Sequence, residues 1–250
     1  MKFIVLLSVF GIYLLLGIYK PDIFNPIFCP NPLDIIKSFV SLFENRMIID
    51  GLLASFTRIT LATLLAIFVS VPLGIFSGLF SKVETIITPF SNSFRFLPIT
   101  ALFPLFIMWF GIGEEMKIIF LFFAVFFFFL PTVLNEVKNV DVDLIETAYT
   151  MGMNKLQVIW HVILPSICPT LCQSFITMYG IGWTYVIMAE VINSQSGIGF
   201  ILNIAASRGR TDIVFVCLFV IIIFSYLFDL LGNIFIRRTF KWKFIKQVTD

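Results

Sequence analysis

Residues 146–165 read ETAYTMGMNKLQVIWHVILP, and this stretch is more polar than the long apolar runs on either side of it. The chain as a whole is 59% hydrophobic and only 13% charged. Soluble domains are closer to about 45–50% apolar and about 25% charged residues. We therefore expect a membrane protein in which residues 146–165 form an exception, a segment exposed to water.

Transmembrane helices need about 20 consecutive apolar residues, and six segments of the chain come close to this length. The alternating short segments of a membrane β-barrel are absent from the sequence. The expected fold class is an all-α membrane protein with about six transmembrane helices. The predicted spans are approximately Phe3–Tyr19, Leu52–Phe80, Ile86–Phe110, Ile118–Leu134, Pro169–Ile192 and Ile213–Ile236.

Two of the segments between or within these spans are irregular. After a proline-rich start, Leu33, Ile36, Val40 and Phe43 recur at helical spacing, which predicts an amphipathic helix at the membrane interface. The third span contains three prolines and Arg95. Irregular backbone at membrane depth is tolerated where it is packed in protein, so we expect this span to face the interior of the helix bundle.

The orientation of the chain follows from its basic residues. Six spans place both termini on one side, and the last segment carries a basic cluster: Arg237, Arg238, Lys241, Lys243 and Lys246. The positive-inside rule assigns that cluster to the cytoplasm. Both termini and residues 146–165 of this multi-pass protein are then predicted to be cytoplasmic.

The local sequence around residues 140–165 predicts two short helices. Asp141 and Asp143 are good N-cap residues, and Asp143 followed by Glu146 has the spacing of a capping box. Gly152 stands where a helix commonly ends in a left-handed cap, and Asn154 is suited to start a second helix that runs to Leu164–Pro165. The expected product is a bent helix pair in the cytosol.

This pair would expose a small apolar ridge, which suggests that a partner protein binds it. The ridge residues are Leu144, Ile145, Ala148 and Met151. A second interpretation stays open, in which Glu146 only caps its helix and Gly152 only ends it.

One motif resembles a known family. Glu146-x-Ala148, three residues, Gly152, nine residues and Val162-x-Leu164-Pro165 resembles the EAA loop of ABC importer permeases, with Thr147 and Val162 as mild departures. In that family the loop docks into a groove on the ATPase subunit. The resemblance implies that Glu146, Ala148 and Gly152 are docking residues, with Ala148 kept small and Gly152 allowing the turn. Leu164 and Pro165 would pass the motion to the fifth span.

Two further segments are similar to the nitrate, sulfonate and taurine branch of these permeases. They are LPITALFPLFIMWFGIGEEMKI (97–118) and AEVINSQSGIGFILNIAASRGRTDIVF (189–215). The chain departs from the branch at Phe96 and Ile99, where a denser proline cluster is usual. The resemblance implies a type I ABC importer permease fold, with a transmembrane anchor and outer loop at 1–50, a permease domain at 51–236 and a basic tail at 237–250.

Three ionisable residues within the predicted spans are candidates for the translocation pathway. A charge at bilayer depth costs at least ~2.5–3.5 kcal/mol, so each one needs a reason. Arg58, Arg95 and Glu190 are the candidates. Snorkelling of Arg58 to the interface, anchoring by Arg95 and contact of Glu190 with a binding protein are the alternatives.

The expected function is half of the translocation pathway of an ATP-driven importer. The chain lacks a GxxxxGK[ST] phosphate loop, so ATP would be bound by a separate ABC ATPase subunit and the chain itself would need no cofactor and no metal. A periplasmic or lipid-anchored substrate-binding protein and a second permease copy, giving a homodimer, are the other expected partners. The net charge of +2 gives no reason to expect a nucleic-acid partner.

Two alternative functions fit the sequence less well. A secondary transporter or channel without an ATPase would need an inverted repeat or a charged relay, and we find no convincing repeat. An enzyme is not expected, because a membrane-embedded enzyme would need a cluster such as HExxH or paired carboxylates within one span, and the chain has a single histidine. The cargo is open among nitrate, sulfonates, taurine, bicarbonate and vitamin precursors.

Overall fold

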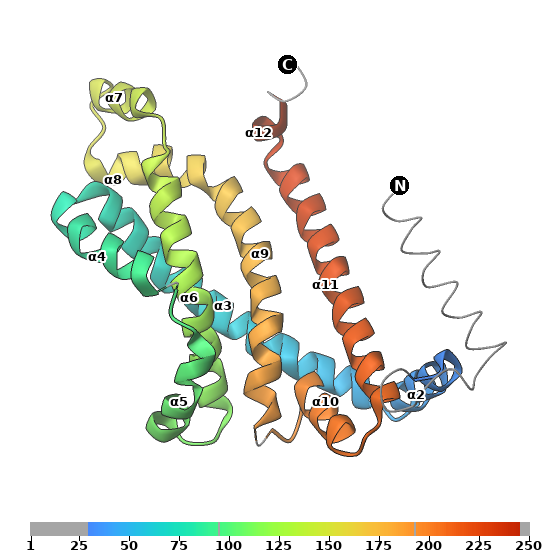
Figure 1. Ribbon diagram of the computed structural model, residues 1–250. Helices are drawn as coiled ribbons and strands as arrows, with labels where there is room; N and C mark the ends of the chain where they lie inside the picture. The colour runs from blue at the N-terminus through green and yellow to red at the C-terminus, as the bar shows by residue number, and fades with distance from the viewer. Residues whose placement is uncertain (1–29, 95, 193, 246–250) are drawn as a thin grey trace. The chain divides into compact units, whose positions relative to one another are not determined.

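The computed structural model describes residues 30–94, 96–192 and 194–245, and every regular element within them is helical (Figure 1). The longer helices are α2 (Pro32–Glu44), α3 (Met47–Leu79), α4 (Ser81–Phe94), α5 (Phe103–Phe110), α6 (Glu114–Lys138), α7 (Val142–Thr150), α9 (Leu164–Val191), α10 (Ile198–Ser207) and α11 (Thr211–Thr239). Short helical turns complete the set: η2 (Ile99–Leu102), α8 (Lys155–Val158), η3 (Ile159–Ile163) and α12 (Lys241–Ile245).

Four described helices are long and apolar enough to cross a membrane: Met47–Leu79, Glu114–Lys138, Lys155–Val191 and Thr211–Thr239. A fifth candidate is the pair Lys82–Phe94 and Ile99–Phe110, which is bent by 88°. The predicted helical membrane fold is confirmed, and the bent pair coincides with the irregular third span that the sequence predicted. The first predicted span, Phe3–Tyr19, lies outside the described residues.

The chain divides into two compact units. One consists of the residues up to Thr57 together with Ile187–Phe224, and the other of Arg58–Val186 with Ser225–Asp250. The boundaries fall inside α3, α9 and α11, so each of these helices contributes to both units. The two units are described one at a time below.

In the second unit, small residues let α3 approach α6 closely. Ala62, Ala66 and Ser70 recur every four residues on α3 and are buried. A Cβ atom on Gly74, the next residue in this row, would lie 2.4 Å from the side chain of Val133 on α6. Helices in membranes gain little from hydrophobic burial against lipid, so close packing of this kind holds them together.

Helices α9 and α11 pack in the same way in the second unit. A Cβ atom on Gly232 would lie 2.5 Å from Ile176. Tyr179 and Phe228 stack with their ring centroids 4.0 Å apart, an arrangement that adds to the burial of the two rings. The absence of a side chain at Gly232 therefore allows the aromatic contact to form.

In the first unit, helix α2 has three distinct faces. Ile35 and Leu42 are buried in a cluster with Ile48 and Val216. A second, polar face carries Asp34 and Lys37, both of which are exposed. The third face is apolar and exposed, and it holds the residues whose helical spacing predicted the element: Leu33, Ile36, Val40 and Phe43. The predicted amphipathic helix is confirmed, and its place at the membrane interface stays a prediction.

The fifth predicted span, Pro169–Ile192, falls within a longer helix that runs from Lys155 to Val191, apart from its last residue. Prolines lack a backbone N–H and normally interrupt a helix. Here the five-residue π-helical turn η3 precedes Pro165, which lies in the first turn of α9, and the helix continues through Pro169. Helix α10, between the last two spans, was not predicted as a helix.

Candidate functional site

Helix α7 starts from Asp141, whose carboxylate accepts a hydrogen bond from the backbone N–H of Asp143 at 3.0 Å. The predicted capping box between Asp143 and Glu146 was wrong. Asp143 is already inside the helix, and its carbonyl accepts the hydroxyl of Thr147 at 2.6 Å. The Glu146 side chain is exposed, and this leaves it available to a partner.

Gly152 ends α7 in the left-handed conformation that the sequence predicted, with φ of 83°. The N–H of Met153 donates to the carbonyl of Ala148 at 3.1 Å, and that of Gly152 donates to Tyr149 at 2.9 Å. These two bonds are the pair that defines a Schellman motif. The carbonyls at the end of α7 are therefore satisfied within the loop, which fixes the direction of the chain that follows.

The next helix is capped from both sides. The Asn154 side chain accepts from the N–H of Gln157 at 2.9 Å, and the Gln157 side chain accepts from the N–H of Asn154 at 2.8 Å. This capping box confirms the predicted helix start at Asn154. The chain then runs as one helix from Lys155 through Leu164 and Pro165 to Val191. At the start of α9, Leu164 is half-buried and Pro165 is exposed.

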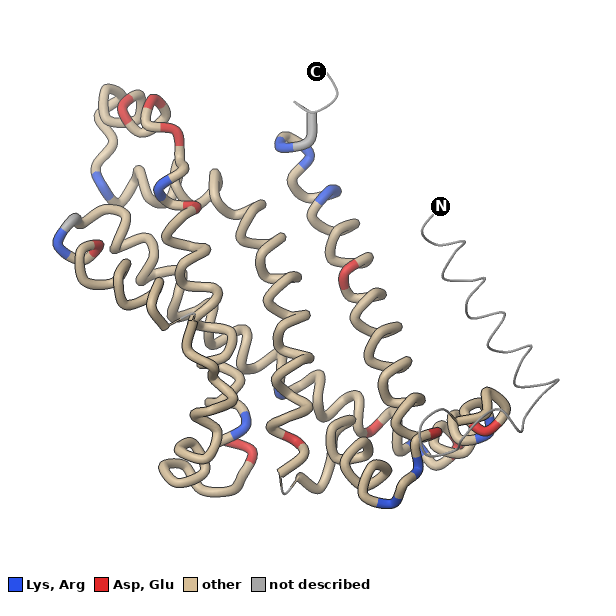
Figure 2. Tube along the Cα trace, viewed as in Figure 1, with Lys and Arg blue, Asp and Glu red and all other residues tan. Residues whose placement is uncertain are grey.

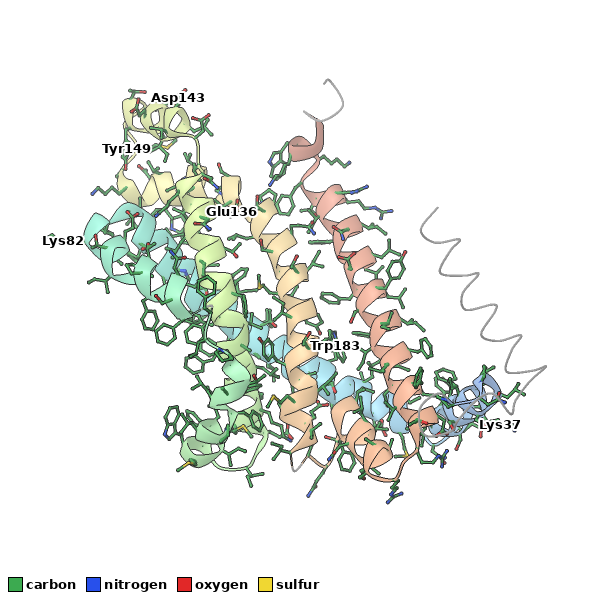
Figure 3. The ribbon with its side chains drawn as sticks, in the orientation of Figure 1. Lys37, Lys82, Glu136, Asp143, Tyr149 and Trp183 are labelled. Atoms are coloured by element: carbon green, nitrogen blue, oxygen red, sulfur yellow. The ribbon has the colours of Figure 1, made fainter. Side chains whose placement is uncertain are left out.

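We call residues 141–163 the coupling loop. Its exposed apolar side chains are Val142, Leu144, Tyr149, Met151, Leu156 and Trp160. Met151 is 73% exposed, whereas Ala148 is only 4% exposed. The small side chain of Ala148 therefore packs inside the loop, and the apolar ridge consists of its neighbours. Figure 3 shows Asp143 and Tyr149 projecting from α7, beyond the end of α6 that carries Glu136.

One charged residue connects the coupling loop to the transmembrane helices of the second unit, and two others connect helices of that unit to one another. The ammonium of Lys155 lies 5.6 Å from the ring centroid of Phe80, between α3 and α4. Lys138 at the end of α6 forms a 2.7 Å salt bridge with Glu84 on α4. Lys243 on α12 donates a hydrogen bond to Thr170 on α9. Figure 2 shows acidic residues on α7 and basic residues at the end of α11 and on α12.

Arg58 lies in a buried charged cluster of the second unit. Its Nε and Nη2 donate to the two carboxylate oxygens of Glu114 at 2.5 and 2.8 Å, and Lys117 donates to the same carboxylate at 2.8 Å. The side chains of Arg58 and Lys117 are 5% and 3% exposed, and that of Glu114 is 57% exposed. Sequence reasoning missed Glu114 and Lys117, although their i, i+3 spacing at the start of a helix is the signal of a charge pair.

Glu190 lies in the first unit and is fully buried. Its carboxylate accepts the hydroxyl of Ser55 at 2.8 Å and the N–H of Gly199 at 2.8 Å, while the N–H of Ile198 donates to the Ser55 hydroxyl at 2.9 Å. A carboxylate at a helix N-terminus satisfies unpaired N–H groups and interacts favourably with the helix dipole. Glu190 and Ser55 therefore hold the first turn of α10. A role of Glu190 in a pathway stays a prediction.

A second polar cluster of the first unit joins α2 to α11. Arg210 forms a 2.7 Å salt bridge with Asp212, and the Ser38 hydroxyl donates to the same carboxylate at 2.5 Å. The hydrogen bonds that the Arg210 guanidinium donates to the Asp212 carboxylate raise the pKa of Arg210 above its ordinary value, so this guanidinium stays charged. Arg95 lies outside the described residues. Among the residues that are described, no group of three or more His, Cys, Asp or Glu side chains is placed to hold a metal ion.

Comparison with known proteins identifies the family. Residues 70–241 match the model described as the binding-protein-dependent transport system inner membrane component. The chain belongs to this family. It is an ABC transporter permease, a transport protein of the inner membrane and not an enzyme.

Two relatives agree with the branch that the sequence resembles. The taurine transport system permease protein TauC of Escherichia coli (strain K12) is 32% identical over 226 residues, which cover 88% of this chain and 82% of that protein. The putative aliphatic sulfonates transport permease protein SsuC of Bacillus subtilis (strain 168) is 29% identical over 214 residues, covering 86% and 78%. The resemblance to the nitrate, sulfonate and taurine branch is confirmed.

The fold is shared with a solved importer. The permease superimposes on a chain of the MetNI methionine ABC transporter in an inward facing conformation with a TM-score of 0.70. The two chains are 19% identical, and the match covers 77% of the permease and 95% of that chain. The predicted type I ABC importer permease fold is confirmed.

Proposed function

We propose that this permease forms half of the translocation pathway for a small sulfonate, and that a separate ATPase drives it by binding the coupling loop. ATP is bound by the ATPase subunit, and the permease itself needs no cofactor. A second copy of the permease completes the pathway as a homodimer. A periplasmic or lipid-anchored binding protein delivers the solute, and both termini of the permease lie in the cytoplasm.

The observation that carries the ATPase assignment is the apolar ridge of the coupling loop. Met151, Leu144 and Leu156 are more than half exposed on a segment whose helix ends are all capped. Burying one such side chain is worth about 1.5–3 kcal/mol. A rigid loop that exposes several of them is suited to bind a groove on a soluble partner without losing much conformational entropy.

The continuous helix from Lys155 to Val191 supports the transfer of motion. Because α8, η3 and α9 are not separated by a loop, a displacement of α8 acts directly on α9. The Schellman motif at Gly152 and the capping box at Asn154 hold the turn between α7 and α8, so α7 and α8 move together. Leu164 and Pro165 then lie along the path of the force and not at a hinge.

The substrate class rests on the two relatives. One is named for taurine and the other for aliphatic sulfonates, and both align with more than four fifths of this permease. A sulfonate is a small oxyanion with three equivalent oxygens, which arginine and lysine side chains bind well.

The ATPase assignment is tested by co-purification of the permease with the ATPase subunit and by ATP-driven uptake into proteoliposomes. Met151→Asp places a charge on the ridge, and we expect it to abolish both association and uptake. Asp143→Asn is the matched control, because its side chain is exposed on the same helix outside the ridge. If Met151→Asp retains the ATPase and transports normally, the coupling loop does not bind the ATPase.

The substrate assignment is tested in the same proteoliposomes, supplied with the binding protein and radiolabelled taurine. We expect uptake that requires ATP hydrolysis and is competed by other alkanesulfonates. Uptake that runs at the same rate without ATP would instead indicate the secondary transporter or channel. ATP-driven uptake of other solutes but of no sulfonate would contradict the substrate class alone.

A further inference from the structure

The cluster of Arg58, Glu114 and Lys117 is asymmetric in its exposure to solvent. The two cationic side chains are almost completely buried, while the carboxylate between them is more than half exposed. Arg58 comes from the N-terminal half of α3, and Lys117 from the first turn of α6 on the side that packs into the protein. The packed helices thus fix the two cations, and the anion is the member that reaches outward.

The segment that carries Glu114 leaves it room to move. Glu114 is the first residue of α6 and follows Gly111-Ile112-Gly113. A Cβ atom at Gly111 or Gly113 would meet nothing within 4 Å, and the Glu114 side chain itself is 57% exposed. A rotation about the side chain of Glu114 can therefore release its carboxylate without repacking the core.

The donors are arranged for an oxyanion. The guanidinium of Arg58 presents Nε and Nη2 as a fork to two oxygens, and the Lys117 ammonium donates to one of them from another side. This bidentate geometry with an added ammonium fits any small carboxylate or sulfonate. The structure contains one such group already, the carboxylate of Glu114.

We propose that Arg58 and Lys117 form a binding site for the anionic group of the transported solute, and that Glu114 occupies this site as an internal competitor. An incoming sulfonate replaces the carboxylate, which swings toward solvent and returns when the solute leaves. The exchange keeps an anion beside the two buried cations throughout, and removing one member of a buried ion pair is strongly unfavourable. A neutral solute lacks the charge needed for the exchange.

This proposal rests on the proposed transport function and adds the site that selects the solute. Its test uses the full-length permease alone in lipid nanodiscs, without ATPase or binding protein. Methanesulfonate is titrated, and binding is followed by intrinsic tryptophan fluorescence and by the shift of the thermal unfolding midpoint. Dimethyl sulfone, which has a similar shape and no charge, is titrated in parallel.

We expect saturable binding of methanesulfonate to the unaltered permease and none of dimethyl sulfone. Glu114→Gln removes the competitor and should bind methanesulfonate at least tenfold more tightly, while Lys117→Met should bind it at least tenfold more weakly. The control is Glu84→Gln, which removes the carboxylate of the salt bridge to α6 outside the cluster and should leave the affinity unchanged. If Glu114→Gln is less stable, methanesulfonate should restore its unfolding midpoint more than that of Glu84→Gln.

The proposal is overturned if Glu114→Gln binds no more tightly than the unaltered permease, if Lys117→Met binds equally well, or if dimethyl sulfone binds like methanesulfonate. These outcomes are independent of the coupling loop. Met151→Asp should bind methanesulfonate normally even where it loses the ATPase, so a failure of the anion site and a failure of the ATPase assignment are distinguishable.

Discussion

Gly197→Ala tests the buried contact between the first turn of α10 and the carboxylate of Glu190. A Cβ atom at this position would lie 2.2 Å from the carboxyl carbon of Glu190, far inside van der Waals contact. The backbone at Gly197 has φ of 118° and ψ of 161°, a region that is occupied almost only by glycine. The substitution therefore strains the backbone and also expels the carboxylate from its place.

The backbone strain and the lost hydrogen bonds together set the expected loss in the free energy of unfolding. A non-glycine residue in this region of backbone conformation costs about 1–3 kcal/mol. Displacing the carboxylate breaks its hydrogen bonds from Ser55 and from the N–H of Gly199, and hydrogen bonds to charged groups contribute about 1.5–3 kcal/mol each. The lower ends of these ranges already predict a loss of about 4 kcal/mol in the free energy of unfolding.

The measurement is reversible unfolding in mixed detergent micelles, followed by tryptophan fluorescence. Gly180→Ala is the matched control, because Gly180 lies in helix α9 with nothing within 4 Å of its Cβ position. Alanine in a helix is favoured over glycine by about 1 kcal/mol, so this control should be neutral or slightly stabilising. A loss below about 1 kcal/mol for Gly197→Ala would refute the argument that the Glu190 carboxylate fixes α10 at this glycine.

Three smaller changes in the second unit follow from the same reasoning and are measured by the same unfolding assay. Gly152→Ala should lower the free energy of unfolding by about 1 kcal/mol, because φ is 83° at this position while the space around it is open. The control is Gly113→Ala, where φ is −172°, and it should not show this loss. Equal losses for the two variants would contradict the left-handed cap at Gly152. Gly74→Ala should cost about 1–3 kcal/mol by overpacking against Val133, and a neutral result would contradict the close α3–α6 contact. Glu84→Gln should cost less than about 1 kcal/mol, falling further at high salt, because its salt bridge to α6 is partly exposed; a larger or salt-independent loss would contradict this.

The sequence predicted most of the helical architecture because the thickness of the bilayer sets the length of apolar sequence that a spanning helix needs. It failed at Pro165, where the second short helix was predicted to end and the structure has a continuous helix. A π-helical turn before Pro165 accommodates the missing N–H group, and this accommodation depends on neighbouring packing that a local pattern does not contain. Helix α10 was missed because its ten residues are too short for a span.

The coupling loop was predictable to the extent that its structure is local. Gly152 and Asn154 act on residues within five positions, and both predictions are confirmed. The capping box predicted at Asp143 was wrong, because the helix starts two residues earlier, with Asp141 as its N-cap. Asp141 and Asp143 are equally good N-cap residues, so the sequence does not distinguish them. The spacing of residues along α7 predicts that Ala148 lies on the exposed ridge. It is buried instead because α7 packs against η3, which the local sequence does not show.

Arg58 and Glu190 show why charges within the spans were identified while their partners were not. The cost of an unpaired charge in a membrane requires a partner for each, and this requirement is visible in the sequence. The partner is not, because Glu114 lies 56 residues from Arg58 and Ser55 lies 135 residues from Glu190. In each case the carboxylate meets the first turn of a helix: Glu114 begins α6, and Glu190 accepts from the start of α10. Helix starts offer unpaired N–H groups and a favourable dipole, so they are the places where a membrane protein can hold a carboxylate at low cost.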